Sequence, residues 1–219
     1  MKNTIVQLIK SMIPCMLLHL CVVINAQEIE PEVTIERKKL VILTADTSTS
    51  AGLERFKKTY PEKIIDCGIA EQNMMGIAAG LASEGNNVIT TTFAPFQTMR
   101  CCEQIKVNLG YMNQNVTMVG LASGVVQGIL GYTHSCIEDL SIMRSIPGIT
   151  VLSPADCTET AKAINAALEY NGPVYIRLTG GSSNPAVYKD DYDYKIGKAI
   201  KLKKGNEVSL IATGTMVHV

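Results

Sequence analysis

The sequence predicts an α/β domain with a doubly wound, mostly parallel sheet. From residue 40 onward, short aliphatic or β-branched runs alternate with helical stretches. Most of the strand-like runs read as continuous stretches of aliphatic or β-branched residues, which is typical of parallel strands that are buried on both faces. Strands separated by helices also favour right-handed crossovers, which leave every strand pointing the same way.

The expected elements alternate along the chain. The strands are residues 40–44 (LVILT), 63–66 (KIID), 87–92 (NVITTT), 116–120 (VTMVG), 149–153 (ITVLS) and 174–178 (VYIRL). The helices between them are residues 51–58, 73–83, 96–108, 137–144 and 157–170. Pro154 ends a strand because it lacks an N–H group, and Asp156 can cap the helix that follows. Ligands of such sheets bind beyond the carboxyl ends of the strands, so the loops there are the place to look for a site.

Composition excludes some functions. The chain has 219 residues, of which 47% are hydrophobic, and its 20 basic and 20 acidic side chains give a formal net charge of zero. No net field therefore attracts nucleic acid. The seven cysteines form no CxxC pair and have no histidine at ligand spacing, which indicates reduced thiols in a cytosolic protein and no metal site.

Residues 1–37 form a separate N-terminal segment. Within residues 1–26, Lys2 and Lys10 precede an apolar run that ends at Ala26, which is the pattern of a signal peptide or membrane anchor. A proline and a histidine interrupt that run, and it is short for a membrane span. The alternative is an uncleaved helix that docks on the domain or on a partner. Since the chemistry argued below uses cytosolic metabolites, we expect the uncleaved helix and a cytoplasmic protein.

The chain after the last expected strand divides into two parts. Residues 38–182 form the main domain, and residues 183–204 are polar and rich in Lys, Asp and Tyr, as in a solvated linker. Residues 205–219 contain EVSLIATG, which is expected to be the first strand of a further domain. One strand cannot form a core alone, so we expect either a shortened protein or pairing with another chain.

The helix over residues 73–83 (NMMGIAAGLAS) is apolar or small on every side, so we expect it to be buried all round. Gly76 and Gly80 are four residues apart, which allows another helix to approach closely and suggests self-association through residues 73–83. Glu71 comes just ahead of this helix. A carboxylate there is favoured by the helix N-terminus in any protein, so its position alone does not show a function.

These motifs resemble the transketolase and 1-deoxyxylulose-5-phosphate synthase families. The resemblance begins at GIAEQNM with its AAGLA helix. It continues through TFAPF, EQIK, GYTH, IEDLSIMRSIPG, VLSPAD, PVYIRL and EVSLIATG, over about residues 38–217. The matching segments are the pyrimidine-binding domain and the first strand of the carboxy-terminal domain. The resemblance implies thiamine diphosphate as cofactor.

The resemblance implies that Glu71 is the glutamate that hydrogen-bonds N1′ of the cofactor's aminopyrimidine and so favours removal of the thiazolium C2 proton. That role needs a carboxyl group that holds or shares a proton, and burial favours the neutral form of an acid. Phe93 and Phe96 match the aromatic residues that pack on the pyrimidine, although core phenylalanines are the alternative.

The resemblance implies further roles in strand-end loops. Asp46 matches an aspartate near the thiazolium, and Ser50 a serine that contacts substrate phosphate, although both also suit a turn and helix cap. His134 matches a catalytic-site histidine that contacts the sugar, with a structural histidine as the alternative. Arg177 matches an arginine that binds substrate phosphate. For Arg100, the spacing suggests only an ion pair with Glu103.

Two departures from the family pattern concern the substrate. Leu130 stands where the sugar-phosphate enzymes have an aspartate, and Ala122 stands where they have a histidine. An apolar residue leaves substrate hydroxyls unpaired, which disfavours a standard transketolase substrate. A related sugar, unphosphorylated or deoxygenated, fits this pattern better.

The sequence has no GDG segment followed by an Asn pair, which in these families holds Mg²⁺ and the diphosphate. We therefore expect a diphosphate-binding, amino-terminal-type transketolase subunit to hold the Mg²⁺ and to share the cofactor. The leading hypothesis is the pyrimidine-binding subunit of a split enzyme that transfers a two-carbon ketol unit to or from a sugar or sugar phosphate. The alternatives are a subunit of a pyruvate-decarboxylating synthase and a truncated, non-catalytic binding subunit.

Overall fold

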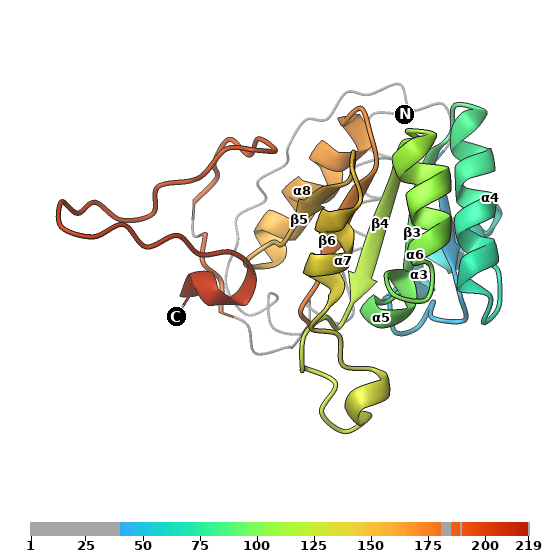
Figure 1. Ribbon diagram of the computed structural model, residues 1–219, viewed down its shortest axis with the longest axis horizontal. Coiled ribbons are helices and arrows are strands. Elements are labelled where there is room, and N and C mark those ends of the chain that lie inside the picture. The colour runs from blue at the N-terminus through green and yellow to red at the C-terminus, as the bar shows by residue number, and fades with distance from the viewer. Residues whose placement is uncertain (1–39, 181–184, 189, 219) are drawn as a thin grey trace.

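A computed structural model describes residues 40–180, 185–188 and 190–218, and the predicted N-terminal segment lies outside these residues. The domain is a parallel six-stranded sheet in the order β2-β1-β3-β4-β6-β5, with helices on both faces (Figure 1). The strands are β1 (Leu40–Thr44), β2 (Ile64–Asp66), β3 (Asn87–Phe93), β4 (Val116–Leu121), β5 (Thr150–Leu152) and β6 (Val174–Arg177). All six lie where the sequence predicts them, to within one or two residues at each end. This confirms the doubly wound α/β fold.

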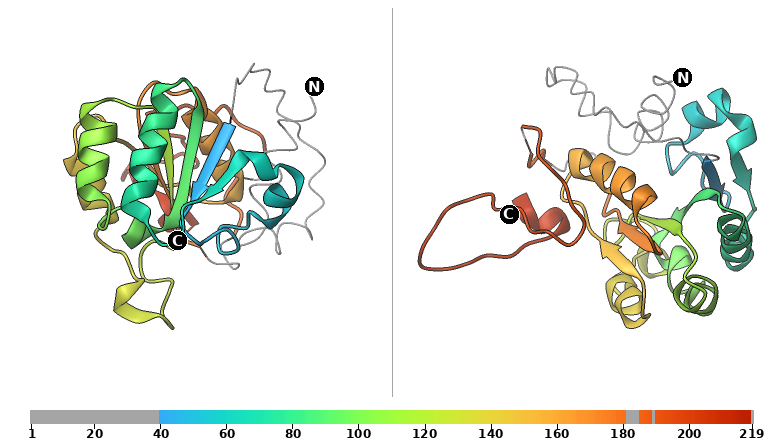
Figure 2. Two further views of the ribbon diagram at one scale, coloured as in Figure 1. Left: turned by 90° about the vertical axis from the view of Figure 1, so that its right-hand side faces the viewer. Right: turned by 90° about the horizontal axis from the view of Figure 1, so that it is seen from above.

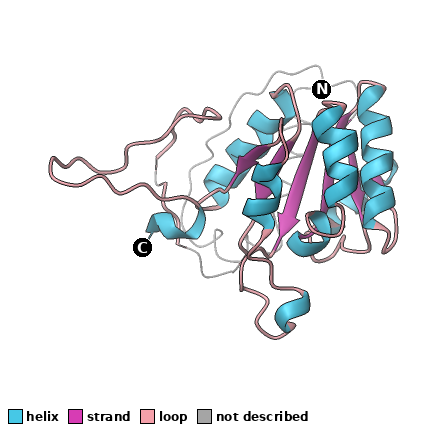
Figure 3. Cartoon of the chain, viewed as in Figure 1, coloured by secondary structure: helices cyan, strands magenta, loops and turns pink. Residues whose placement is uncertain are grey.

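Two helical layers cover the sheet. The helices are α3 (Glu54–Thr59), α4 (Glu71–Ser83), α5 (Ala94–Gln97), α6 (Cys102–Gln104), α7 (Asp139–Ser145) and α8 (Cys157–Glu169). A π-helix, η2 (Ile105–Tyr111), continues α6, and single 3₁₀ turns form η1 (Pro61–Lys63), η3 (Gly131–Thr133) and η4 (Gly214–His218). Figures 2 and 3 show α4, η2 and α7 on one face of the sheet, and α3 and α8 on the other. No helix in the described part of the chain is long and apolar enough to cross a membrane.

The strands separate two apolar cores because successive side chains point to opposite faces. In β1, Leu43 packs with the core under α4, η2 and α7, whereas Ile42 packs with the core under α3 and α8. In β4, Met118 and Val119 divide in the same way. Both faces are therefore dry, which explains why the strands read as continuous apolar runs.

The helix predicted over residues 96–108 is not continuous. It divides into α5, α6 and η2, with turns between Thr98 and Cys101. The chain widens at the break, since the N–H of Arg100 donates to the carbonyl of Pro95 at 3.2 Å, five residues earlier. The thiol of Cys101 also donates to the carbonyl of Phe96 at 3.1 Å, which takes up a carbonyl at the end of α5. The interruption places Arg100 in a turn.

Helix α4 is buried on one side only, so the prediction of burial on all sides is wrong for this chain. Met74, Met75, Ala78 and Ala79 are buried against the sheet. The opposite side carries exposed residues, namely Gln72, Asn73, Gly76, Gly80 and Ser83. A Cβ built on Gly76 or Gly80 would meet no atom of the described residues within 4 Å. The small residues that predicted burial on all sides thus lie partly on the exposed face of the helix.

The described part of the predicted linker is not fully solvated. Tyr194 and Ile196 pack on the core under α8. The Asp156 carboxylate, through Oδ2, accepts from the backbone N–H groups of Val187 and Tyr188 at 2.8 and 3.0 Å. This segment is therefore a strap that crosses α8, held by the same aspartate that caps the helix.

The strand expected in residues 205–219 does not form. Residues 206–213 have no regular structure, and Val208, Leu210 and Ile211 are exposed. In the described chain no neighbouring strand pairs with this segment, and an unpaired strand gains no backbone hydrogen bonds. The end of this segment contacts the main domain, because the N–H of Gly214 donates to the carbonyl of Ser153, just after β5, at 2.9 Å.

Candidate active site

The predicted site residues come from loops that follow five different strands. Asp46 and Ser50 follow β1, Glu71 follows β2, and Phe93 and Phe96 lie at the end of β3. His134 lies in the loop after β4, and Arg177 ends β6. Because all strands are parallel, their carboxyl ends share one edge of the sheet, where the loop after β4 projects beyond the strands (Figure 1). The fold therefore gathers these residues at a single edge, as in other doubly wound sheets.

Glu71 is the first residue of α4 and is almost completely buried, with 3% of its side chain exposed. Arg100 donates from Nη1 to Glu71 Oε1 at 2.5 Å. The side-chain amide of Gln72 donates to the carbonyl of Arg100 at 2.9 Å, so the start of α4 is joined to the Arg100 turn twice. Sequence spacing paired Arg100 with Glu103 instead, which is wrong because the break after α5 turns Arg100 toward α4.

Phe93, Phe96 and His134 form an aromatic cluster. The rings of Phe93 and Phe96 meet edge to face with centroids 6.2 Å apart. The His134 imidazole lies 5.7 Å from the Phe93 ring and 5.2 Å from the Phe96 ring. Arg100 stacks on Phe96, with its guanidinium carbon 3.9 Å from the ring centroid, an arrangement favoured by the ring quadrupole. Arg100 thus connects the buried acid to the aromatic cluster.

His134 is oriented by its neighbour as well as by the two rings. The Thr133 hydroxyl lies 3.0 Å from His134 Nδ1, and the imidazole is half-buried. This hydrogen bond engages Nδ1 of the imidazole and does not involve Nε2. The structure therefore brings together Glu71, Phe93, Phe96 and His134, the residues predicted for the pyrimidine and the sugar.

The β1 loop is organised by an aspartate that the sequence prediction missed. Asp66, at the end of β2, accepts from the backbone N–H groups of Asp46 at 2.9 Å and Gly68 at 3.0 Å. Asp46 is exposed and has a positive φ of 55°, which Asp tolerates better than most residues. Ser50 is half-buried. Asp66 therefore positions both the β1 loop and the turn that leads to Glu71.

Arg177 belongs to a different network. Its Nε donates to Asp139 Oδ2 at 2.9 Å, and the same oxygen accepts from the Tyr175 hydroxyl at 2.9 Å. Asp139 and Tyr175 are fully buried, whereas 14% of the Arg177 side chain is exposed. Burial, followed by the charge of Asp139, raises the pKa of Tyr175 well above its ordinary value. Asp139, within the IEDLSIMR motif, is a second residue whose role the sequence prediction missed.

The loop after β4 contains the two departures from the family pattern. Leu130 is 48% exposed, and its neighbours Ile129 and Tyr132 are almost fully exposed. Ala122 is buried and has a positive φ of 53°, an uncommon conformation for a residue with a Cβ. The loop after β4 therefore exposes the apolar side chains of Ile129 and Leu130 to solvent.

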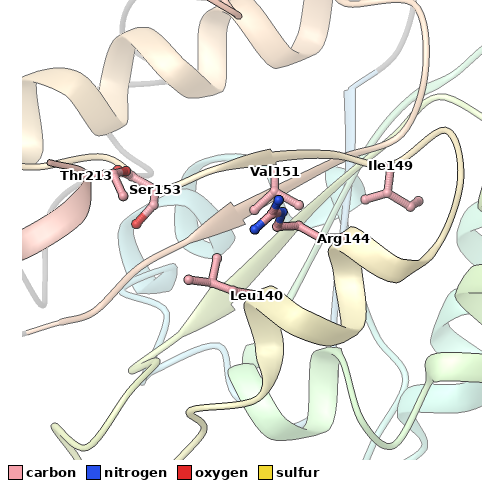
Figure 4. Close-up of a pocket in the computed structure, with 6 residues that line it drawn as sticks. All are labelled: Leu140, Arg144, Ile149, Val151, Ser153 and Thr213. Carbon is pink, nitrogen blue, oxygen red and sulfur yellow. The ribbon is translucent and has the colours of Figure 1, made fainter. Parts of the chain in front are cut away.

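A pocket of about 470 Å³ lies at the β5 edge of the sheet, away from Glu71, which follows the opposite edge strand (Figure 4). Its lining residues are Leu140, Arg144, Ile149, Val151, Ser153 and Thr213. None of the predicted site residues lines it. The candidate active site is therefore a different place from this pocket. It consists of the buried Glu71 and the aromatic side chains at the carboxyl ends of the strands.

These residues have the chemistry to bind an aminopyrimidine ring. A buried carboxyl group can bind an aminopyrimidine nitrogen, and the half-buried aromatic rings linked to it through Arg100 can pack on the pyrimidine. Among the residues that the structure describes, no three His, Cys, Asp or Glu side chains are grouped so that they could hold a metal ion. The fold and site define the class of protein as a pyrimidine-binding domain.

Comparison with known proteins shows the family. The chain matches the family described as "Transketolase, pyrimidine binding domain" over residues 27–184. The chain therefore belongs to the transketolase pyrimidine-binding domain family. Among solved structures it resembles "Split gene transketolase, inactive beta4 tetramer", at 39% identity and a TM-score of 0.72, covering 83% of this chain and 58% of the other.

Curated relatives include proteins named as transketolase subunits. One subunit of the apulose-4-phosphate transketolase of Phocaeicola vulgatus is 38% identical over 188 residues, 85% of this chain and 60% of that protein. The 6-deoxy-6-sulfo-D-fructose transketolase subunit SqwH of Clostridium sp. is 41% identical over 181 residues, 82% of this chain and 55% of that protein. Human transketolase is 36% identical, over 82% of this chain and 29% of that protein. The chain thus spans little more than half the length of the first two relatives.

Proposed function

We propose that this chain is the pyrimidine-binding subunit of a split transketolase that transfers a two-carbon ketol unit between sugars. The single observation that carries the proposal is the buried Glu71, which lies 2.5 Å from Arg100 and is linked through it to the Phe96 ring. Two of the relatives above are named as subunits of transketolases, which supports the split organisation.

In the proposed site, the Glu71 carboxylate would accept a hydrogen bond from the protonated pyrimidine N1′ of the cofactor and share its proton, and Phe93 and Phe96 would pack on that ring. Thiamine diphosphate, when bound, supplies the carbanion chemistry. Asp46 faces the thiazolium end, while Ser50, His134 and Arg177 contact the sugar or its anionic group. For Arg177 this leaves the terminal guanidinium nitrogens, because Nε is engaged with Asp139.

We propose that a diphosphate-binding subunit in the same cytoplasm supplies the Mg²⁺ and diphosphate site. The exposed glycine face of α4 suits a close contact between subunits, and the beta4 tetramer of the split-gene relative supports self-association. The apolar Ile129, Leu130 and Tyr132 in the loop after β4 favour a sugar other than the standard donors. The relatives named for apulose-4-phosphate and 6-deoxy-6-sulfo-D-fructose act on such sugars.

The test combines the chain with an amino-terminal-type transketolase subunit that carries GDG and an Asn pair, which is to be sought among the genes beside this one. Exchange of the cofactor's C2 proton with deuterium, together with ketol transfer, is then measured. We expect Glu71→Ala to slow both by roughly 10²- to 10⁴-fold, because general acid–base catalysis contributes about that much. Glu84→Ala is the matched control, since Glu84 is an exposed carboxylate at the other end of α4. An active Glu71→Ala complex would rule out the assignment.

A further inference from the structure

The sequence suggested only an ion pair with Glu103 for Arg100, yet Arg100 makes the closest charged contact of the candidate site, with Glu71. Its guanidinium lies 2.5 Å from a carboxylate that is only 3% exposed, while 41% of its own side chain is exposed. A buried carboxylate needs such a partner, because an uncompensated charge in the interior is strongly destabilising. The arginine therefore spans from the interior at Glu71 to the open side of the site.

The contact is asymmetric. Arg100 binds Oε1 of Glu71, so the second oxygen of the carboxylate lies outside this hydrogen bond. The guanidinium is planar and stacks on Phe96 at 3.9 Å, which restricts its rotation. Its backbone carbonyl is held by the Gln72 side chain at 2.9 Å. Arg100 is thus fixed at three points, two on α4 and one on Phe96.

We propose that Arg100 is a positioning residue that holds the Glu71 carboxylate by one oxygen and presents the other to the pyrimidine. The proposal rests on the function proposed above. Because the same guanidinium stacks on Phe96, the acid and the ring that packs on the pyrimidine keep a fixed relative orientation. Arg100 acts through Glu71 and touches no reacting atom.

The test compares Arg100→Met, Arg100→Lys and Arg55→Met in the complex with the partner subunit. Arg55 is an exposed arginine on α3 and serves as the matched control. Misplacement of a catalytic group costs roughly 10- to 100-fold, so we expect Arg100→Met to slow C2-proton exchange by that factor at saturating cofactor. The Kd for thiamine diphosphate, measured by calorimetry, should change by less than about threefold, since positioning acts on rate. Arg100→Lys keeps the charge but loses the planar fork, so it should recover part of the rate.

A readout on the free chain needs no cofactor. Arg100→Met leaves the Glu71 carboxylate unpaired, so the thermal unfolding midpoint of this variant should be about 5 °C below that of the wild type. Adding Glu71→Gln to the same chain should restore most of the lost thermal stability, because it removes the unpaired charge. A mere space-filling role would give no such coupling between the two positions. If Arg100→Met fails to fold, the double variant Arg100→Met, Glu71→Gln should still fold, because it leaves no buried charge unpaired, and its recovery supplies the same evidence of coupling.

The outcomes separate the two proposals. A wild-type complex that does not accelerate C2-proton exchange refutes the proposed function, and the role of Arg100 falls with it. An active wild type with an equally active Arg100→Met complex refutes the positioning role alone. Tighter cofactor binding by Arg100→Met, with undiminished exchange, would mean that Arg100 only occupies the place of the pyrimidine, which also overturns the proposal.

Discussion

At the scale of single residues, two buried carboxylates are each paired with one arginine. Glu71 pairs with Arg100 beside the aromatic cluster, and Asp139 pairs with Arg177 beneath the loop after β4. In both pairs the acid is buried and the arginine reaches toward the open edge of the sheet. Asp139 also accepts from the Tyr175 hydroxyl, so it satisfies two buried donors with one oxygen. This makes Asp139 a structural support for Arg177.

We expect Asp139→Ala to lower the free energy of unfolding by about 3 kcal/mol, because it leaves Arg177 and the Tyr175 hydroxyl without their acceptor. Tyr175→Phe removes only one hydrogen bond and should cost about 1 kcal/mol. Urea unfolding of the two variants and the wild type measures both values. An Asp139→Ala variant as stable as Tyr175→Phe would contradict the importance of this network.

At the scale of elements, α4 combines two functions on opposite sides. Its buried side, with Met74, Met75 and Ala78, packs on the sheet and fixes the position of Glu71 at its first turn. Its open side carries Gly76 and Gly80, where no atom of the described chain approaches an added Cβ within 4 Å. A face that no described residue covers, and that has glycines in place of larger side chains at two positions, suits another subunit.

The double variant Gly76→Leu, Gly80→Leu tests this face. The fold should tolerate it, and each substitution should favour the helix by roughly 0.5–1 kcal/mol, since leucine is a better helix former than glycine. Association with a second copy or with the partner should be lost because the leucines block close approach. Analytical ultracentrifugation measures association, and circular dichroism confirms folding. Gly205→Leu, at an exposed glycine outside α4, is the control, and unchanged sedimentation of the double variant would contradict the prediction.

At the scale of the whole molecule, burial favours the neutral form of one cysteine thiol in the core and of two tyrosine hydroxyls in the segment that crosses α8. Burial raises the pKa of Cys101 from its ordinary value of 9.0 to about 12. Burial, with the charges of Glu159 and Asp156, raises the pKa of Tyr188 from 10.0 to about 12, and the pKa of Tyr194 reaches about 12 for the same main reason. Ionisation of these groups therefore favours the unfolded chain.

Stability should consequently fall at high pH. Between pH 9 and about 12 the unfolded chain has lost the Cys101 proton while the folded chain keeps it, so each rise in pH favours unfolding. The contribution is fully present below pH 9 and is lost at about 1.4 kcal/mol per pH unit above it. Urea unfolding from pH 8 to 11 measures the slope. In Cys101→Ala the decline above pH 9 should be shallower but not absent, because burial also raises the pKa of the Cys67 and Cys136 thiols, and an identical curve would contradict the assignment to Cys101.

Local pattern was enough to predict the sheet. Runs of aliphatic and β-branched residues located all six strands, because strands inside the sheet are buried on both faces, and only the edge strand β2 among them is largely exposed. The strand expected at residues 205–219 is the exception, since its pairing partners are not fixed by its own residues. The interrupted helix after Phe96 was also missed, because the i to i−5 contact of Arg100 with Pro95 leaves no mark in hydrophobic periodicity.

The sequence by itself determined the fold class, the family and the set of loops that hold the site. Strand and helix periodicity and the motif around Glu71 are local properties of the chain, and parallel strands necessarily bring their carboxyl ends to one edge. Only the tertiary structure decided the partners of the charged residues. Arg100 reaches Glu71 across 29 positions, and Arg177 reaches Asp139 across 38. Such pairs depend on which loops the fold brings together, and residue spacing along the chain contains no information about them.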